Sequence, residues 1–390
     1  MYPPFSLRHS MAEKWYPFHL EKRKTTFTSI GRRSYRRHIS VAILCGFGIW
    51  SLLLALSVPE WTFGEESEDW RTPEPPRYVL TEDELRVQQT AFDQEFDAAQ
   101  SLQRQSVSAK YPLEWTNSLG IRFRLIPAGT FTMGSSESEV GRQKFDWCGK
   151  ETPHSVTISQ PFYMATTETT QSQWQELMGA QPSKFSAHGE YSDDVKGMET
   201  DHFPVENVSW DEVQEYLQKL NTKDAEQLQS QFGEKIVYAL PTEAQWEYAI
   251  RGGTTSPFGI GVILNGTQAN MDGRDPYGTD IAGPLLNRPV NVGSYPANAW
   301  GIHDGHGNVW EWCEDGWEDD LSSAPVTDPI IRNDQDLRVD RGGSFDNIPA
   351  LCRAAHRGSY ERQRHSGYVG FRIILRFPQP TTAQDVQEIR

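Results

Sequence analysis

Positive charge is in short supply in this chain. Its 390 residues contain 37 Lys and Arg against 53 Asp and Glu, a formal net charge of −16. A nucleic-acid binder needs a basic face to hold phosphate groups, so this balance argues against that class of protein. The hydrophobic content of 37% is too high for a chain that is disordered throughout, and it is sufficient for a substantial core.

Regular repeating architecture is also lacking. The sequence shows no internal repeat and no long alternation of strands and helices of the kind that builds a parallel sheet. Short apolar runs between about residues 115 and 376 are interrupted by Gly, Pro and Asn, and the chain contains 13 Trp and 31 Gly. These features predict a single α+β domain with much irregular structure rather than a helical bundle.

One uncharged apolar run, residues 39–58 (ISVAILCGFGIWSLLLALSV), is long enough to cross a membrane. About 20 helical residues span roughly 30 Å of hydrocarbon. Residues 1–38 carry nine Lys and Arg and two Glu, a net charge of +7, whereas the remainder carries 28 basic and 51 acidic residues, a net charge of −23. This asymmetry predicts a single-pass signal-anchor helix with a cytoplasmic N-terminus and all later residues outside the cytoplasm. A cleaved signal peptide, followed by secretion, is the alternative.

The segments that flank the main domain, residues 113–376, are polar. Residues 59–112 begin as an acidic, Pro-rich linker and continue as a predicted helix from Thr81 to about residue 105. Thr81 and Glu84 are spaced as a capping box. This helix is interpreted as a stalk that acts as a spacer, with packing against the main domain as the alternative. The tail, residues 377–390, is predicted to fray.

Within the main domain, three helices have clear start signals. The predicted N-caps are Thr169 or Thr170, Ser209 and Thr242, and the third helix is predicted to end before Gly252. Short strands are predicted around these helices, at residues 122–127, 131–133, 155–158, 162–165 and 368–375.

Nine sequence blocks follow one another through almost the whole main domain. They are TNSLGIRFRLIPAGTFTMGS (116–135), PHSVTI (153–158), FYMATTETTQSQW (162–174), FPVENVSWDEV (203–213), LPTEAQWEYAIRGG (240–253), YPANAWGIHDGHGNVWEWCED (295–315), RGGSF (341–345), CRAAHR (352–357) and GYVGFRI (367–373). In this order they resemble the formylglycine-generating-enzyme, or sulfatase-modifying-factor, family. The resemblance implies a C-type-lectin-like α+β fold.

The resemblance does not extend to the family's copper site. Members that oxidise a sulfatase cysteine to formylglycine carry two cysteines shortly after a Gly-Gly-Ser-aromatic turn, and these thiolates bind Cu(I). Here the turn at residues 342–345 is followed by residues 346–351 (DNIPAL), which contain neither Cys nor His. Cys352 matches a structural cysteine of the family. The sequence therefore predicts that bound copper is absent, and it assigns no catalytic residue.

Residues 303–311 (HDGHGNVWE) are the main candidate for a metal site. The resemblance implies that this turn wraps a structural Ca²⁺, which takes oxygen ligands. The implied ligands are two carboxylates and two backbone carbonyl groups: Asp304, Glu311, Gly307 and Val309. An iron site built from His303, His306 and a carboxylate is an alternative, as is a hydrogen-bonded turn without metal.

A second family calcium site begins at an Asn-apolar pair, which is matched here by Asn270 and Met271. The carboxylate expected downstream falls near residues 284–286, where no acidic residue stands. Occupancy of this second site is therefore an open question.

Three cysteines follow the hydrophobic run: Cys148, Cys313 and Cys352. Cysteines in an exported domain favour disulfides over free thiols. Because Cys313 and Cys352 lie in the motif-rich part of the domain, they are predicted to pair and to leave Cys148 unpaired.

Three functional interpretations remain. The first is an exported, membrane-anchored family member that binds a peptide, protein or glycan in a cleft near residues 346–351 and lacks formylglycine-generating activity. The second is a metal-dependent oxidoreductase similar to the family's sulfoxide synthases, although those relatives keep histidine ligands in a helical domain and residues 59–112 contain no His. The third is formylglycine generation itself.

Overall fold

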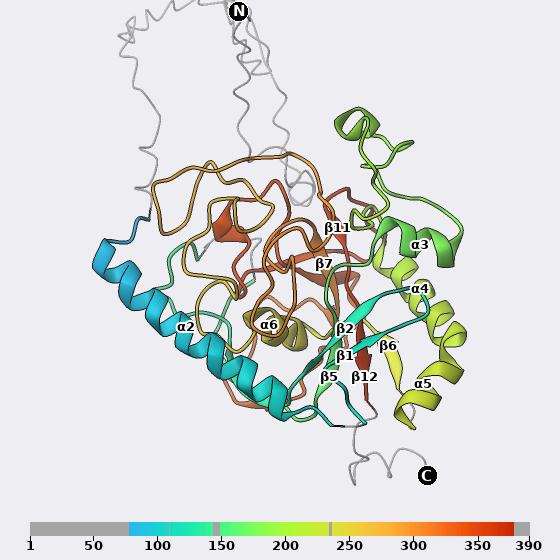
Figure 1. The fold of residues 1–390 in the computed structure, drawn as a ribbon, viewed down its shortest axis with the longest axis horizontal. Helices are drawn as coiled ribbons and strands as arrows, with labels where there is room; N and C mark the ends of the chain where they lie inside the picture. The colour runs from blue at the N-terminus through green and yellow to red at the C-terminus, as the bar shows by residue number, and fades with distance from the viewer. Residues whose placement is uncertain (1–77, 109, 143–148, 234–235, 378–390) are drawn as a thin grey trace, which may run out of the picture. The chain divides into compact units, whose positions relative to one another are not determined.

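A computed structural model describes residues 78–108, 110–142, 149–233 and 236–377 of the chain (Figure 1). These segments belong to one compact unit that spans residues 71–390. The predicted membrane helix at residues 39–58, Cys148 and nearly all of the tail lie outside the described residues. Among the helices that the structure does describe, none combines the length and the apolar character needed to cross a membrane.

The fold is α+β, as predicted. Its α-helices are α2 (Glu82–Gln105), α3 (Gln171–Met178), α4 (Trp210–Lys223), α5 (Ala225–Phe232) and α6 (Glu243–Arg251). Two short 3₁₀ helices are η1 (Ser192–Val195) and η2 (Pro349–Leu351). The strands are β1 (Glu114–Thr116), β2 (Arg122–Ile126), β3 (Gly129–Met133), β4 (His154–Ile158), β5 (Phe162–Ala165), β6 (Val237–Ala239), β7 (Trp310–Gly316), β8 (Val326–Thr327), β9 (Leu337–Arg341), β10 (Arg357–Glu361), β11 (Val369–Gly370) and β12 (Ile374–Arg376).

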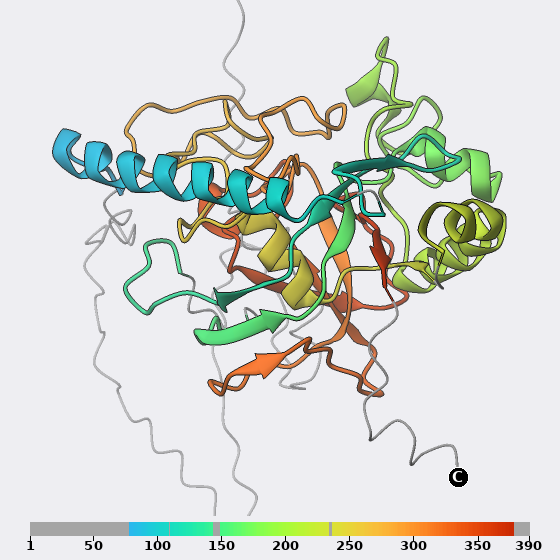
Figure 2. The ribbon, with the colours of Figure 1, turned by 60° about the horizontal axis from the view of Figure 1, so that its bottom comes forward.

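The strands form three small sheets. The largest has the order β1-β2-β5-β12-β6, the second has the order β10-β9-β7-β11, and the third has the order β3-β4-β8. The C-terminal strand β12 pairs antiparallel with both β5 and β6, so the end of the domain closes a sheet that begins near its start. In Figure 2 the three-stranded sheet lies below α2, and the teal β3 is its strand nearest to that helix.

The predicted helix starts are confirmed. Thr81, Thr170, Ser209 and Thr242 are the N-caps of α2, α3, α4 and α6, and each forms a complete capping box with the side chain three residues later. Such a box satisfies backbone N–H groups that the first helical turn leaves without partners. Local sequence therefore specifies these starts.

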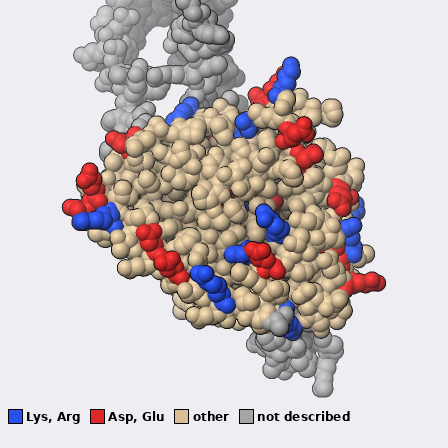
Figure 3. All heavy atoms as spheres, in the orientation of Figure 1, with Lys and Arg blue, Asp and Glu red and all other residues tan. Residues whose placement is uncertain are grey.

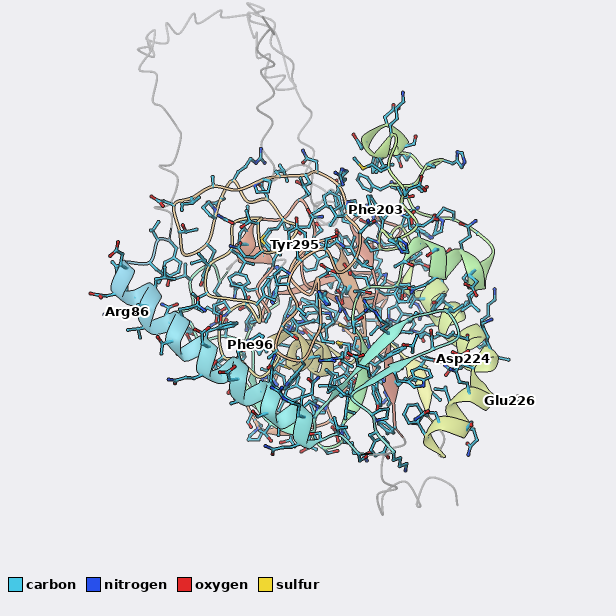
Figure 4. All side chains as sticks on the ribbon, in the orientation of Figure 1. Arg86, Phe96, Phe203, Asp224, Glu226 and Tyr295 are labelled. Atoms are coloured by element: carbon cyan, nitrogen blue, oxygen red, sulfur yellow. The ribbon has the colours of Figure 1, made fainter. Side chains whose placement is uncertain are left out.

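Helix α2 packs against the domain, so its interpretation as a spacer was wrong. The Gln103 amide donates to the carbonyl oxygens of Leu125 and Trp300, both at 2.9 Å. The Trp300 indole donates in return to the carbonyl of Ala99 at 3.1 Å. Figure 4 labels Phe96 on this helix, and its ring packs on the core cluster that contains Trp300. Apolar and amide side chains on one face of α2 therefore fasten it to the domain.

The core is rich in aromatic residues, as the composition suggested. Trp174 stacks on Tyr216 with ring centroids 5.3 Å apart, in the cluster beside α3 and α4. Trp246 and Trp300 are fully buried in a second cluster around α6. Trp210 is half-buried and lies under the guanidinium groups of Arg338 and Arg362. These clusters hold the loops between α6 and β7 that build the candidate site.

Candidate functional site

The predicted metal turn is a tightly bent loop that ends in β7. Asp304, Gly307 and Asn308 adopt positive φ angles of 57°, 98° and 64°, which bend the chain sharply. The loop is tied to distant segments by backbone hydrogen bonds from Gly307 to the Gly342 carbonyl and from Asn308 to the Asn270 carbonyl, both at 2.8 Å. Its position therefore depends on residues far away in the sequence.

Three buried carboxylates gather at this turn, namely Glu168, Asp304 and Glu311. Arg372 forms the ion pair with Glu311, and its Nε and Nη2 atoms each lie 2.5 Å from one carboxylate oxygen. Burial raises the pKa of Glu168 and of Asp304 above the usual carboxyl values. The charge of Asp304 raises the pKa of Glu168 further. Arg372 is thus the guanidinium that offsets the charge of all three carboxyl groups. The buried cluster therefore contains more acidic groups than basic ones.

Two oxygen atoms at this cluster accept no hydrogen bond from any residue that the structure describes. The Glu168 Oε1 atom accepts from the Asn308 amide at 2.8 Å, but Glu168 Oε2 is buried without a partner. The Asn270 amide donates to Asn308 Oδ1 at 3.0 Å, and Asn270 Oδ1 is likewise buried and unpaired. Buried acceptors without a donor are costly, and a cation with oxygen ligands would satisfy them.

The predicted calcium ligands fit this arrangement in part. Asp304 Oδ2 accepts from the Gly293 backbone at 2.5 Å and lies in the cluster. Glu311 is committed elsewhere, because Arg372 takes both of its oxygens and the Trp246 indole donates to Oε2 at 2.7 Å. The described part of the chain contains no group of three or more His, Cys, Asp or Glu side chains arranged to hold a metal. A cation here would need amide and backbone oxygens as well.

Glu168 and Asn270 were not assigned to this cluster from the sequence. Glu168 follows β5, and the loop that carries it is separated by 140 residues from its partner Asn308. Asn270 was assigned to a second calcium site, whereas its side-chain amide is bonded to Asn308. Its neighbour Met271 is buried in an apolar cluster with Phe258. An acidic residue three positions after the end of a buried strand was the available signal for Glu168.

The histidines of the turn are hydrogen-bonded to the backbone. The backbone N–H of Gly259 donates to His306 Nε2 at 2.9 Å, and His306 Nδ1 lies 2.8 Å from the carbonyl of Cys352. Burial lowers the pKa of His306 to about 4. His306 is therefore a neutral structural residue with both nitrogens engaged, and His303 Nδ1 is bonded to the Tyr295 carbonyl at 2.8 Å.

A cavity of about 10 Å³ adjoins the turn, lined in part by Asp304, His306 and Tyr295. Figure 4 labels Tyr295 on the loop that precedes the turn. A cavity of this size has room for a single water molecule. It is too small for an organic substrate, so this part of the site can hold a water or an ion.

The segment that replaces the family's copper ligands is well packed. The Asn347 side chain accepts hydrogen bonds from the backbone and hydroxyl of Ser344, at 2.9 and 3.0 Å. Ala350 lies against Gly141, where an added Cβ atom would come within 3.0 Å of it. Burial raises the pKa of the Cys352 thiol, which disfavours the thiolate that Cu(I) requires.

The predicted disulfide is not present in the structure. Cys313 and Cys352 are free, buried thiols. Cys313 lies on β7 in the cluster around Trp246, whereas Cys352 follows η2 and packs in the separate cluster with Phe258. Proximity of two motif blocks in the sequence therefore did not bring the two side chains together.

This arrangement predicts that neither thiol reacts in the folded protein. We expect a maleimide to label Cys313 and Cys352 only after denaturation, and to label them equally with and without prior reduction. Peptide mapping by mass spectrometry measures both results. A Cys313–Cys352 cross-linked peptide in the non-reduced sample would contradict the structure.

Comparisons with known proteins agree with the order of the motifs. Residues 119–377 match the family model of the sulfatase-modifying factor enzyme 1-like domain. The chain is 34% identical over 179 residues to a formylglycine-generating enzyme of Streptomyces coelicolor, an alignment that covers 43% of this chain and 51% of that enzyme. The chain thus spans about half the length of that relative.

Two further similarities cover more of the matched protein. Chaperone protein LppX of Paenibacillus barcinonensis is 28% identical over 255 residues, which cover 56% of this chain and 81% of LppX. The structure of PvdO from Pseudomonas aeruginosa superposes with a TM-score of 0.54 and 24% identity, covering 68% of this chain and 98% of PvdO. The latter likeness concerns the fold.

Proposed function

Since this chain belongs to the sulfatase-modifying factor enzyme 1-like family, we propose that it is a binding member that holds a peptide or protein and does not generate formylglycine. One observation carries this proposal. Residues 346–351, which follow Phe345, contain no thiol. The next cysteine, Cys352, is buried, and burial raises the pKa of its thiol. Copper chemistry of the family type needs two thiolates that share one ion.

The similarity to LppX supports a protein or peptide as the ligand. LppX is named a chaperone, and the chain aligns with 81% of it. A glycan, the other ligand class considered from the sequence, lacks such support. The uncharged run at residues 39–58 and its basic flank support a membrane-anchored protein whose binding domain lies outside the cytoplasm.

We further propose a structural Ca²⁺ site at Asp304, Glu168 and Asn270. The excess of buried carboxylates over arginine and the two unpaired buried oxygens support it. A bound Ca²⁺ would supply positive charge there. Asp304 and Glu168 would then hold the turn at residues 303–311 against the loop that follows β5.

The proposal is tested by asking whether the protein converts a sulfatase cysteine to formylglycine. We expect that the purified protein, supplied with Cu(I) and oxygen, leaves a Cys-x-Pro-x-Arg sulfatase peptide unchanged, because the dithiolate is missing. Mass spectrometry would show conversion as loss of the thiol and gain of an aldehyde. A formylglycine-generating enzyme run in parallel is the positive control.

An oxidoreductase is the second candidate, favoured by the 34% identity to the Streptomyces enzyme. Turnover in the wild type that disappears in Cys352→Ser would establish it and would overturn the binding assignment. Turnover that persists in this variant would place the oxidation at another metal site.

A further inference from the structure

A groove of about 640 Å³ runs between α2 and β3, and none of residues 346–351 lines it. One wall is formed by α2, with Ala98, Ala99 and Leu102, and the opposite wall is formed by β3 and the residues that follow it. Leu102 is a large apolar residue with 43% of its surface exposed. On the face that Figure 3 draws, acidic and basic side chains alternate along α2. Three charged residues line the groove, namely Glu95, Glu139 and Arg251, and the rest of its lining is uncharged.

The β3 wall has an open hydrogen-bonding edge. In the order β3-β4-β8, β3 pairs with β4 on one side, and no strand of the described residues lies on the other. No described residue bonds to the backbone of residues 129–133 apart from those of β4. The edge is then anchored at Gly134, whose N–H donates to Glu247 and whose carbonyl accepts from Arg251, both at 2.8 Å. An unpaired edge on a fixed strand is a template for another strand.

A second observation points into the same groove. Tyr248 is 96% buried, and it lines the groove where its hydroxyl lies over Gly129. A Cβ atom on Gly129 would come within 2.4 Å of that hydroxyl oxygen. The hydroxyl makes no hydrogen bond to any part of the chain that the structure describes, and it is not among the fully buried atoms without a partner, so a ligand in the groove can reach it. The ring is buried while the hydroxyl faces the groove, so the hydroxyl can donate to a ligand beside the strand edge.

The charged residues of the groove indicate which peptide charge it accepts. The Glu95 carboxylate on α2 accepts only from the backbone and hydroxyl of Thr255, both neutral groups at 2.8 Å. Arg251, by contrast, is paired with Glu247. The chain after residue 38 also carries a net charge of −23. The groove therefore favours a ligand that is uncharged or basic over an acidic one.

We propose that this groove binds an extended peptide segment of a partner protein, uncharged or basic, which adds as a strand to the free edge of β3. The peptide backbone would pair with residues 129–133, and one of its carbonyl groups would accept from the Tyr248 hydroxyl. Its apolar side chains would pack between Phe131 and Leu102. This inference rests on the proposed peptide-binding function and supplies the place and the conformation of the ligand.

The probe is a blocked nonapeptide with lysine at both ends and alternating valine and threonine between them. It is titrated into the full chain by calorimetry. Alternate N–H groups of a strand point to opposite edges, so two versions N-methylated on opposite edges share the same side chains. We expect one N-methylated version to bind like the parent and the other to bind about tenfold more weakly or worse. A version with glutamate at both ends should also bind more weakly.

Matched variants locate the binding. Ala98 and Ala91 are both exposed and lie two turns apart on α2, but only Ala98 lines the groove. We expect Ala98→Arg to weaken binding by about tenfold or more and Ala91→Arg to leave it unchanged. Tyr248→Phe, which removes only the hydroxyl, should weaken binding about fivefold.

Several results would contradict the proposal that the groove binds a peptide. These are equal binding of both N-methylated versions, equal effects of Ala98→Arg and Ala91→Arg, and absence of binding by the parent probe at millimolar concentration. Formylglycine production would overturn the proposed function instead. If Ala98→Arg bound the peptide as tightly as the wild type, the proposed function would stand but the groove would not be the binding site.

Discussion

Replacing Arg372 with methionine should lower the free energy of unfolding by about 3–5 kcal/mol, because it breaks a buried ion pair on one side only. Arg372 and Glu311 are both fully buried, and the guanidinium is bonded to both carboxylate oxygens. The substitution would leave Glu168, Asp304 and Glu311 without their shared cation. Urea unfolding followed by tryptophan fluorescence in the presence of a chelator measures the loss.

Two further variants separate this effect from a simple loss of a side chain. Arg86→Met removes an exposed arginine whose pair with Asp83 is also exposed, and we expect a change below about 0.5 kcal/mol. Adding Glu311→Gln to Arg372→Met should restore part of the lost stability, because it removes the stranded charge. If Arg372→Met and Arg86→Met were equally stable, the charge argument for this cluster would be wrong.

Calcium should raise the thermal stability of the protein, and the gain should increase with pH. A ligand that binds only the folded state at 100 times its Kd stabilises it by about 2.7 kcal/mol. The pKa values of Glu168 and Asp304 are raised in the folded state. The folded state therefore holds its protons to higher pH than the unfolded state. The stability this provides is complete below the ordinary carboxyl pKa and disappears as the pH rises through the raised values.

Melting curves with calcium and with a chelator, recorded from weakly acidic to mildly alkaline pH, test this expectation. Without calcium, melting temperature should fall as these carboxyl groups ionise, and calcium should offset that fall. Asp304→Asn and Glu168→Gln should each reduce the calcium gain, whereas Asp97→Asn on the exposed side of α2 should not. A wild type that melts identically with calcium and with chelator at every pH would exclude the site.

Local patterns in the sequence determined the parts of the fold that depend on neighbouring residues. The capping boxes of α2 and α4 could be located because each joins residues only three positions apart. For α3 and α6 the sequence indicated only the cap, at Thr169 or Thr170 and at Thr242. The family and the α+β class followed from the ordered motifs, several of whose tryptophans are buried in the core. The sequence also shows that the segment at residues 346–351, where the resemblance places the copper ligands, contains no thiol whatever its conformation.

Only the tertiary structure decided which groups share a buried space. Packing joined Arg372 to Glu311 across 61 residues, so Glu311, a predicted calcium ligand, is an ion-pair partner. It also joined Asn308 to Glu168 across 140 residues, which places Glu168 in the cluster although the sequence did not assign it there. It also separated Cys313 from Cys352 and docked α2 beside the open edge of β3. Burial removes water from all these groups, so each group must be satisfied by the protein atoms around it. Long-range packing decides which atoms those are, and the spacing of residues along the chain does not.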